Sequence, residues 1–149
     1  MIIHGGLVAW RRRGFWRGAL IQGPSGSGKS DLMIRTLDRG ASLVADDRVV
    51  VWTSGGALYG RAPDTLQGLI EARGLDVLPH PTVGFAEIRI SVHCEPTGGE
   101  IERVHMGETE AIAGVETPVL RVKAFEASAP AKLYAALRRL GRETGKAQL

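Results

Sequence analysis

The chain has 149 residues, of which 44% are hydrophobic and 23% charged, and its formal net charge is +3. This composition is typical of a soluble globular domain, and no apolar run is long enough to cross a bilayer, so we expect no membrane partner. The single cysteine, Cys94, cannot form an internal disulfide, and the first ten residues do not have the pattern of a secretory signal. We therefore expect a cytoplasmic protein.

The N-terminal part of the chain is predicted to form two strands, a loop and a helix. Residues 2–9 are predicted as one strand, an arginine-rich turn follows, and residues 19–22 form a short buried strand. The loop Gly23–Gly28 leads into a helix over Lys29–Arg39. Gly40 then supplies the left-handed conformation that commonly ends a helix.

The turn between the first two strands combines basic and aromatic residues. Such a mixture raises the question of nucleic acid binding, but no nucleic-acid-binding motif accompanies it. A solvated hairpin turn is the more common explanation for an arginine cluster, so we expect no nucleic acid partner. The residues are Arg11, Arg12, Arg13 and Arg17, with Trp10, Phe15 and Trp16 among them.

Strands dominate the remainder of the chain. They are predicted at residues 42–45, 48–52, 57–59 and 85–94, whereas residues 65–72 are predicted to be helical or irregular. Ser128 is expected to cap a final helix that ends near Leu140. The alternation in the strand over residues 85–94 predicts one buried face, on which the cysteine is packed rather than reactive. The residues of that face are Ala86, Ile88, Ile90, Val92 and Cys94.

The most specific motif is a complete phosphate-binding P-loop, which matches G-x-x-x-x-G-K-[ST] at every fixed position. Its glycines let successive backbone N–H groups face phosphate oxygens, and the N-terminus of the following helix adds its positive dipole end. Lys29 can reach the β- and γ-phosphates and Ser30 can ligate Mg²⁺, so we expect ATP and Mg²⁺ as cofactors. The motif consists of Gly23, Pro24, Ser25, Gly26, Ser27, Gly28, Lys29 and Ser30.

Two adjacent carboxylates, Asp46 and Asp47, follow the predicted strand 42–45. In P-loop proteins an acidic residue at the end of a strand commonly lies beside Mg²⁺. Neighbouring strand positions face opposite ways, so one carboxylate is expected to face the γ-phosphate while the other points elsewhere. A simple Asp-Asp turn between two strands is an equally good interpretation of their position.

Four further polar residues are candidates that no motif singles out. Glu71 could complete a metal site and Arg73 could bind phosphate, but both could equally form the polar face of a surface helix. His4 is a lone histidine near the start of the chain, and Arg103 lies in no motif. Their assignment therefore depends on a resemblance to known proteins.

Together these segments resemble the catalytic domain of the HPr kinase/phosphorylase family, which acts on a serine of the phosphocarrier protein HPr. The resemblance runs from His4-Gly5 through the P-loop and Leu43–Val49 to Ile70–Leu75, and more weakly to about Leu120. It implies a single α/β catalytic domain over residues 1–149. This would be a P-loop-containing mixed-sheet domain similar to the nucleotide-binding core of phosphoenolpyruvate carboxykinases. The position of His4 near the first residue is similar to a short proteobacterial type that lacks an N-terminal domain.

The resemblance also implies a role for each candidate residue. Asp47 would accept the serine proton in phosphorylation and donate it in dephosphorylation. With Asp47 in that role, the alternation of a strand predicts that Asp46 points to the opposite face. Negative charge in the transition state would be spread by the basic residues and the metal. The implied catalytic residues are Asp47, His4, Lys29 and Arg103, and the implied Mg²⁺ ligands are Ser30 and Glu71.

The implied function is an ATP- and Mg²⁺-dependent serine kinase acting on an HPr-like phosphocarrier protein. With inorganic phosphate as the attacking group, the same site would release pyrophosphate. Pro118–Ser128 replaces the family segment tied to dephosphorylation, so kinase activity is the firmer expectation. A small-molecule kinase and a nucleotide-sensing module that works with a sensor kinase are the alternatives, and homo-oligomerisation is left open.

Overall fold

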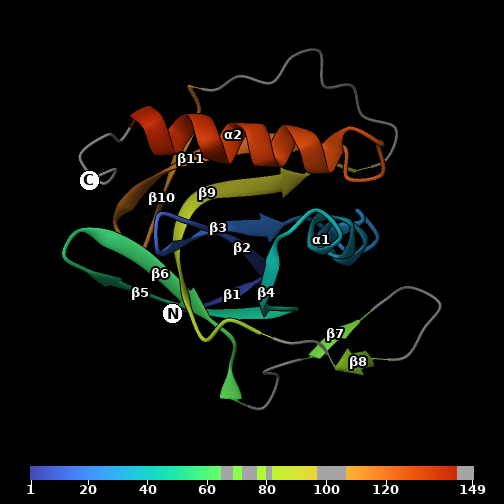
Figure 1. The fold of residues 1–149 in the computed structure, drawn as a ribbon, viewed down its shortest axis with the longest axis horizontal. Helices are drawn as coiled ribbons and strands as arrows, with labels where there is room; N and C mark the ends of the chain where they lie inside the picture. Colours follow the sequence, from blue (N-terminus) through green and yellow to red (C-terminus); the bar gives the residue numbers. More distant parts are fainter. Residues whose placement is uncertain (65–68, 72–76, 80–81, 97–106, 144–149) are drawn as a thin grey trace.

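In the part of the chain that it describes, the computed structural model has one large sheet with two helices packed on it and a separate two-stranded sheet (Figure 1). It describes residues 1–64, 69–71, 77–79, 82–96 and 107–143. The helices are α1 (Lys29–Leu37) and α2 (Ala129–Glu143). The strands are β1 (Ile2–His4), β2 (Gly6–Arg12), β3 (Phe15–Gln22), β4 (Ser42–Ala45), β5 (Arg48–Ser54), β6 (Ala57–Arg61), β7 (Leu69–Glu71), β8 (Val77–Pro79), β9 (Ala86–Cys94), β10 (Thr109–Ile112) and β11 (Val115–Val122). The predicted mixed α/β domain with many strands and few helices is confirmed.

Strand β9 joins the two halves of the large sheet. The strand order is β1-β5-β6-β9-β3-β2-β4, and β11 pairs with β9 and with β10. Along one side β9 runs parallel to β3, from Arg17↔Glu87 to Gln22↔His93. Along its other side it pairs first antiparallel with β6 and then parallel with β11. β7 and β8 form a separate two-stranded sheet.

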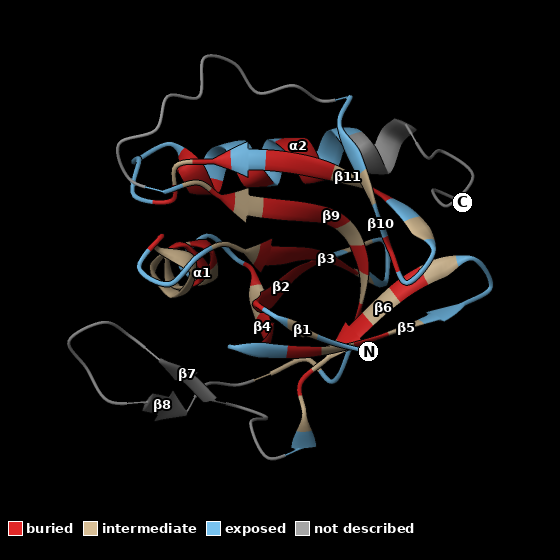
Figure 2. Cartoon of the chain, turned by 180° about the vertical axis from the view of Figure 1, so that it is seen from behind, coloured by how far each residue is buried: buried red, intermediate tan, exposed pale blue. Residues whose placement is uncertain are grey.

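Two hydrophobic clusters form the core, and alternate residues of β2 divide between them. Val8 and Trp10 face the cluster that contains both helices, and Leu7 and Ala9 face the other. Figure 2 shows β2, β3 and β9 as the buried centre of the molecule. The helices contribute Leu32, Met33, Ala129, Leu133, Ala136 and Leu137 to the first cluster.

The apolar residues of β9 are all buried, but they do not share the single face that the alternation predicts. The register between β9 and β3 shifts at Gly18/Ala19, which pair with Ile88 and Ile90. Such an irregularity reverses the side on which the following residues lie. Ala86 and Ile88 therefore belong to one cluster, and Ile90, Val92 and Cys94 to the other.

The predicted single strand over residues 2–9 is two strands, which Gly5 separates. The Gly5 N–H donates to the carbonyl of Asp47 at 2.9 Å, so it leaves the pairing of the large sheet. A Cβ at this position would lie 2.6 Å from the carbonyl oxygen of Ile21, so a larger residue does not fit without movement. This break allows β1 to pair with β5 while β2 pairs with β3 and β4.

Other predicted boundaries are close to the observed ones. The helix after the loop ends at Leu37 rather than Arg39, and Gly40 has the expected positive φ of 92°. The last helix begins at Ala129, directly after Ser128, as predicted. The strands 42–45 and 48–52 are confirmed, the second extending to Ser54.

Two parts of the sequence were predicted wrongly or not at all. Leu69–Glu71, inside the segment predicted to be helical or irregular, is strand β7, paired with β8. The antiparallel pair β10 and β11 was not predicted, although β11 is an internal strand of the sheet.

The arginine-rich hairpin is only partly a solvated turn. Arg13 and Gly14 form the exposed turn, with φ of 51° and 81°. Arg17, however, is only 5% exposed. The reason is that β3 begins at Phe15 rather than at residue 19, so Arg17 is part of the sheet and pairs with Trp10 and Glu87.

Two further findings concern the helices and the single cysteine. None of the helices in the described ranges has the length and hydrophobicity needed to cross a bilayer. Cys94 is 2% exposed, and burial raises the pKa of its thiol to about 12. The prediction that Cys94 is packed is therefore confirmed, and a raised pKa disfavours the reactive thiolate form.

Candidate functional site

The glycine-rich loop connects the end of β3 to the start of α1. Gly23, Gly26 and Gly28 have positive φ values of 155°, 80° and 95°, which residues with a side chain seldom adopt. Gly28 is also the residue that precedes the helix, and a Cβ there would lie 3.0 Å from Ala124 and Phe125. The loop therefore needs glycine for both its conformation and its close packing.

Lys29 and Ser30 begin helix α1 and lie beside this loop. Lys29 Nζ donates to the carbonyl oxygens of Gly23 at 2.7 Å and Pro24 at 3.1 Å. The ammonium group is thus held over the loop, close to the N-terminal end of the helix. Ser30 Oγ donates to Asp46 Oδ1 at 3.4 Å. A cation, a hydroxyl and a carboxylate meet at the positive end of the helix dipole.

Asp46 and Asp47 both line the same cavity, so the expected opposite orientation of Asp46 is wrong. The reason is local backbone geometry. Asp47 has a φ of 71°, and the N–H of Arg48 donates to the carbonyl of Asp46 at 2.8 Å. The chain therefore turns at these two residues, and the alternation of a strand does not apply. Aspartate tolerates this left-handed conformation better than most residues.

The two carboxylates differ strongly in their surroundings. Asp46 is 8% exposed and bonded to Ser30. The side chain of Asp47 is 57% exposed, and its oxygens lie 3.6 Å from His4 Nδ1 and 3.7 Å from Arg48 Nε. Asp46 thus lies deep in the cavity beside the loop, whereas Asp47 lies at its solvent-exposed rim. The β1–β5 pairing, with His4 opposite Arg48, places the histidine there.

The cavity bounded by these residues has a volume of about 390 Å³. Its walls come from four parts of the chain that are distant in sequence: the junction of β1 and β2, the loop with α1, the turn after β4, and the turn before α2. It brings together five of the eight predicted loop residues with His4 and Asp47. The lining residues are His4, Gly5, Gly6, Ser25, Gly26, Gly28, Lys29, Ser30, Asp31, Asp46, Asp47 and Phe125.

Phe125 is a lining residue that the sequence did not indicate. It is held near the loop by Arg35 of α1, which donates to the carbonyl oxygens of Ala124 and Glu126 and pairs with Asp31 at 3.0 Å. This half-buried arginine carries no motif, and the two carbonyl groups that it bonds lie far along the chain. Only the fold reveals that α1 anchors this turn against the cavity.

The structure does not place all of the predicted site residues. Arg73 and Arg103 lie outside the described residues, and for Glu71 it describes the backbone of β7 alone. In the described part of the chain no three histidine, cysteine or acidic side chains form a group that could hold a metal ion. Ser30 and Asp46 supply hard oxygen donors, which suit Mg²⁺ when substrate phosphates complete its coordination.

Comparison with known proteins decides the family. The family model of the HPr Serine kinase C-terminal domain matches residues 2–134, which is most of the chain. The chain belongs to this family. The resemblance seen in the sequence is confirmed at the level of the HPr kinase C-terminal domain.

Relatives with curated names agree with this assignment. The HPr kinase/phosphorylase of Enterococcus faecalis is 33% identical over 131 residues, covering 80% of this chain and 41% of that protein. That of Bordetella pertussis is 46% identical over 74 residues, covering 49% of this chain and 24% of that protein. The chain therefore spans less than half the length of these HPr kinase relatives.

The fold is also shared with a solved structure. The Hpr(Ser) kinase/phosphatase from Coxiella burnetii superposes with a TM-score of 0.79, covering 97% of this chain and 99% of that one. At 22% sequence identity this similarity shows the fold alone.

Proposed function

We propose that this domain is an ATP- and Mg²⁺-dependent serine kinase that acts on an HPr-like phosphocarrier protein in the cytoplasm. The observation that carries the proposal is the cavity that gathers Lys29, Ser30, Asp46 and Asp47 at the N-terminus of α1. Family membership supports the choice of substrate, because relatives over this region bear the name HPr kinase/phosphorylase.

The loop Gly23–Ser30 would bind the phosphates of ATP as a P-loop. Backbone N–H groups of the loop and the first turn of α1 would face the phosphate oxygens, and Lys29 Nζ would contact the β- and γ-phosphates. When bound, Mg-ATP supplies the phosphoryl group, and the metal neutralises charge on its oxygens. Ser30 and Glu71 would hold the metal, and the position of Asp46 beside Ser30 adds a third oxygen donor.

Asp47 would act as the base at the acceptor side. A serine hydroxyl attacks poorly unless its proton is removed as the new bond to phosphorus forms, and a carboxylate can take that proton. Asp47 stands at the mouth of the cavity beside His4, the other residue assigned to catalysis there. Arg103 would join Lys29 in stabilising the transferred group. Products are then ADP and the phosphoserine protein, with the proton on Asp47.

Exposure of the proposed base favours a protein acceptor over a small molecule. The side chains of Asp47 and His4 are 57% and 66% exposed, so a serine on the surface of another protein can reach them. A small-molecule kinase usually encloses its acceptor in a pocket that excludes water. A nucleotide-sensing module would not need Asp47 or His4 at the rim of the cavity, so their presence there also favours a kinase.

The reverse reaction would use the same groups. An oxygen of inorganic phosphate would attack the phosphorus of phosphoserine, Asp47 would return its proton to the serine oxygen, and pyrophosphate would leave. We propose this phosphorylase activity as secondary, because the turn that carries Phe125 lies in the segment Pro118–Ser128 that differs from the family pattern.

The test is single-turnover transfer from labelled ATP, with Mg²⁺, to purified HPr-like phosphocarrier protein. Asp47→Asn keeps the shape of the side chain and removes the base, so transfer should fall by about 10²–10⁴-fold. ATP affinity, measured separately by calorimetry, should change little. Absence of transfer by the wild type to this acceptor would refute the kinase proposal. Transfer by Asp47→Asn at the wild-type rate would leave the kinase but remove Asp47 as its base.

A further inference from the structure

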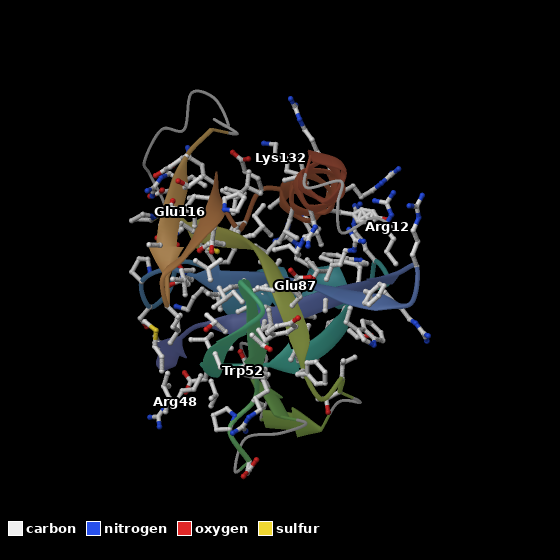
Figure 3. All side chains as sticks on the ribbon, turned by 90° about the vertical axis from the view of Figure 1, so that its left-hand side faces the viewer. Arg12, Arg48, Trp52, Glu87, Glu116 and Lys132 are labelled. Carbon is white, nitrogen blue, oxygen red and sulfur yellow. The ribbon has the colours of Figure 1, made fainter. Side chains whose placement is uncertain are left out.

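A second cavity lies between the β2–β3 hairpin and helix α2, on residues that the proposed kinase does not use. Its volume is about 360 Å³. Figure 3 shows Arg12 beside α2, on the opposite side of the molecule from Arg48, which neighbours Asp47. The lining residues are Trp10, Arg11, Arg12, Arg17, Tyr134, Leu137 and Arg138, so four of the seven carry a guanidinium group.

Two of these guanidinium groups have a buried nitrogen with no hydrogen-bond partner in the described part of the chain. They are Nη1 of Arg17 and Nη1 of Arg12. Arg17 is only 5% exposed, and a buried cationic N–H group without a hydrogen-bond acceptor is costly, so proteins normally supply an anion or another acceptor. Arg17 faces Glu87 across the strand pair, but Glu87 Oε2 is bonded to Arg89 Nη1 at 3.0 Å.

The charges around Arg17 are predominantly positive. Burial first, then the neighbouring Arg89 and Arg12, lower the pKa of Arg17, and Glu87 offsets this only in part. Among the described residues that line the cavity, none carries a carboxylate. An anion that enters it would therefore meet an excess of positive charge and two unused N–H donors.

Aromatic and apolar side chains from both β2 and α2 also line the cavity. Trp10 and Tyr134 contact edge to face, with ring centroids 5.3 Å apart, and Leu137 lies beside them on α2. Arg138 is stacked over the Tyr134 ring, with Cζ 5.7 Å from the centroid. Planar guanidinium groups bind phosphate through paired N–H bonds, while an aromatic wall binds a flat or apolar body.

We propose that this cavity, here called the arginine pocket, binds a small phosphorylated molecule that carries a ring or another apolar part. Its volume is in the range of small-molecule sites. The arginine pocket is separate from the proposed nucleotide site. Gly6, at the start of β2, lines the nucleotide site, and Arg12, at the end of β2, lines the arginine pocket. Six steps along an extended strand separate them by about 20 Å.

The experiment uses the full chain with Lys29→Ala, so that phosphate groups bind weakly at the loop, and phenyl phosphate as the probe. The indole N–H of Trp10, which donates to the carbonyl of Arg39 at 3.4 Å, reports binding by NMR after assignment with Trp10→Phe. We expect a saturable shift of this resonance. Phenyl phosphate should bind at least about tenfold more tightly than inorganic phosphate or phenol alone.

Matched variants locate the site. Arg17→Gln and Arg138→Gln should each weaken binding by about tenfold or more, because each removes a charge-assisted contact. Arg61→Gln removes the same charge from β6, outside the pocket, and should leave the affinity unchanged. Arg138 is exposed, so its variant remains informative if Arg17→Gln fails to fold. An unmoved Trp10 resonance, or full affinity in Arg138→Gln, would overturn the arginine pocket as a binding site. Equal affinity for inorganic phosphate would overturn the assigned ligand class.

Discussion

At the scale of single residues, Lys29 is bonded to the same loop with which it is proposed to bind phosphate. Its two bonds to the carbonyls of Gly23 and Pro24 keep the ammonium group where phosphate would lie. Lys29→Ala removes a charge-assisted contact worth roughly 1.5–3 kcal/mol, so ATP affinity should fall about tenfold or more. Calorimetry with Mg-ATP measures this. Lys132→Ala, which removes a surface lysine paired with Glu126, is the control and should bind as the wild type does.

A second single-residue prediction concerns Asp46, whose contact with Ser30 suggests that it contributes to metal binding. Asp46→Asn should weaken the binding of ATP with Mg²⁺ by about tenfold, because a charged oxygen donor near the metal is lost. Binding of ATP without Mg²⁺ should hold steady or improve, since repulsion between carboxylate and phosphate also disappears. Calorimetry at several Mg²⁺ concentrations separates the two effects.

The matched control for this substitution is Asp64→Asn. Asp64 is 96% exposed and pairs only with Arg61 among the interactions that the structure shows. An unchanged Mg²⁺ dependence in Asp46→Asn would contradict a metal role and leave this carboxylate as a positioning group for Ser30.

At the scale of elements, the junction between β6 and β9 depends on a residue without a side chain. A Cβ on Gly60 would lie 2.8 Å from Leu7, 2.9 Å from Val49 and 3.1 Å from Ile88. All three side chains are buried, so they can yield little, and Gly60→Ala should destabilise the fold by about 1–3 kcal/mol. Urea denaturation measures the loss. Gly84→Ala, where a Cβ would meet open space, should be close to neutral.

Elements defined by local signals were predictable, and those defined by distant partners were not. The loop and α1 carry glycines, a motif and an apolar stripe within one short stretch, so both were found. Leu69–Glu71 has no such signal, and its pairing with β8 decides that it is a strand. The two faces of β9 arise from a register shift against β3, which is far away in sequence.

At the scale of the whole molecule, stability should depend on pH through Glu110. Burial alone would raise the pKa of this carboxyl. Hydrogen bonds from Ser91 and His93, together with the charges of His93 and Arg121, outweigh burial, so the pKa of Glu110 lies below its usual range. Because its pKa is lower in the folded state, ionised Glu110 stabilises the fold at any pH above its ordinary pKa, near 4.5. This stabilisation is lost as the pH falls through the pKa of Glu110 in the folded state.

The measurement is the free energy of unfolding of the wild type and Glu110→Gln at about pH 7 and about pH 3. The difference between the two proteins should be larger at neutral pH and should shrink in acid. Glu116→Gln, which removes a nearby exposed carboxylate bonded to Thr109, should show a smaller dependence on pH. A constant difference between wild type and Glu110→Gln would contradict the prediction.

The sequence could predict the parts of the candidate site that are contiguous in the chain, but not the contacts that depend on the whole fold. The loop residues are contiguous, and Asp46 and Asp47 were noticed as a pair. That His4 stands 3.6 Å from Asp47 follows only from the pairing of β1 with β5. Both carboxylates line one cavity because the chain turns at Asp47, where φ is positive, and no periodicity predicts this turn.

The central position of β9 also governs when the domain can fold as it is made. β2 and β3 can pair as a hairpin early, but the other edge of β3 is completed only by β9, and β11 then adds to β9. Pairing between strands so distant in sequence is slow, and a ribosome adds about 5–20 residues per second. The growing chain therefore carries an apolar strand with one open edge for several seconds, and in that interval it is most exposed to pairing with another chain.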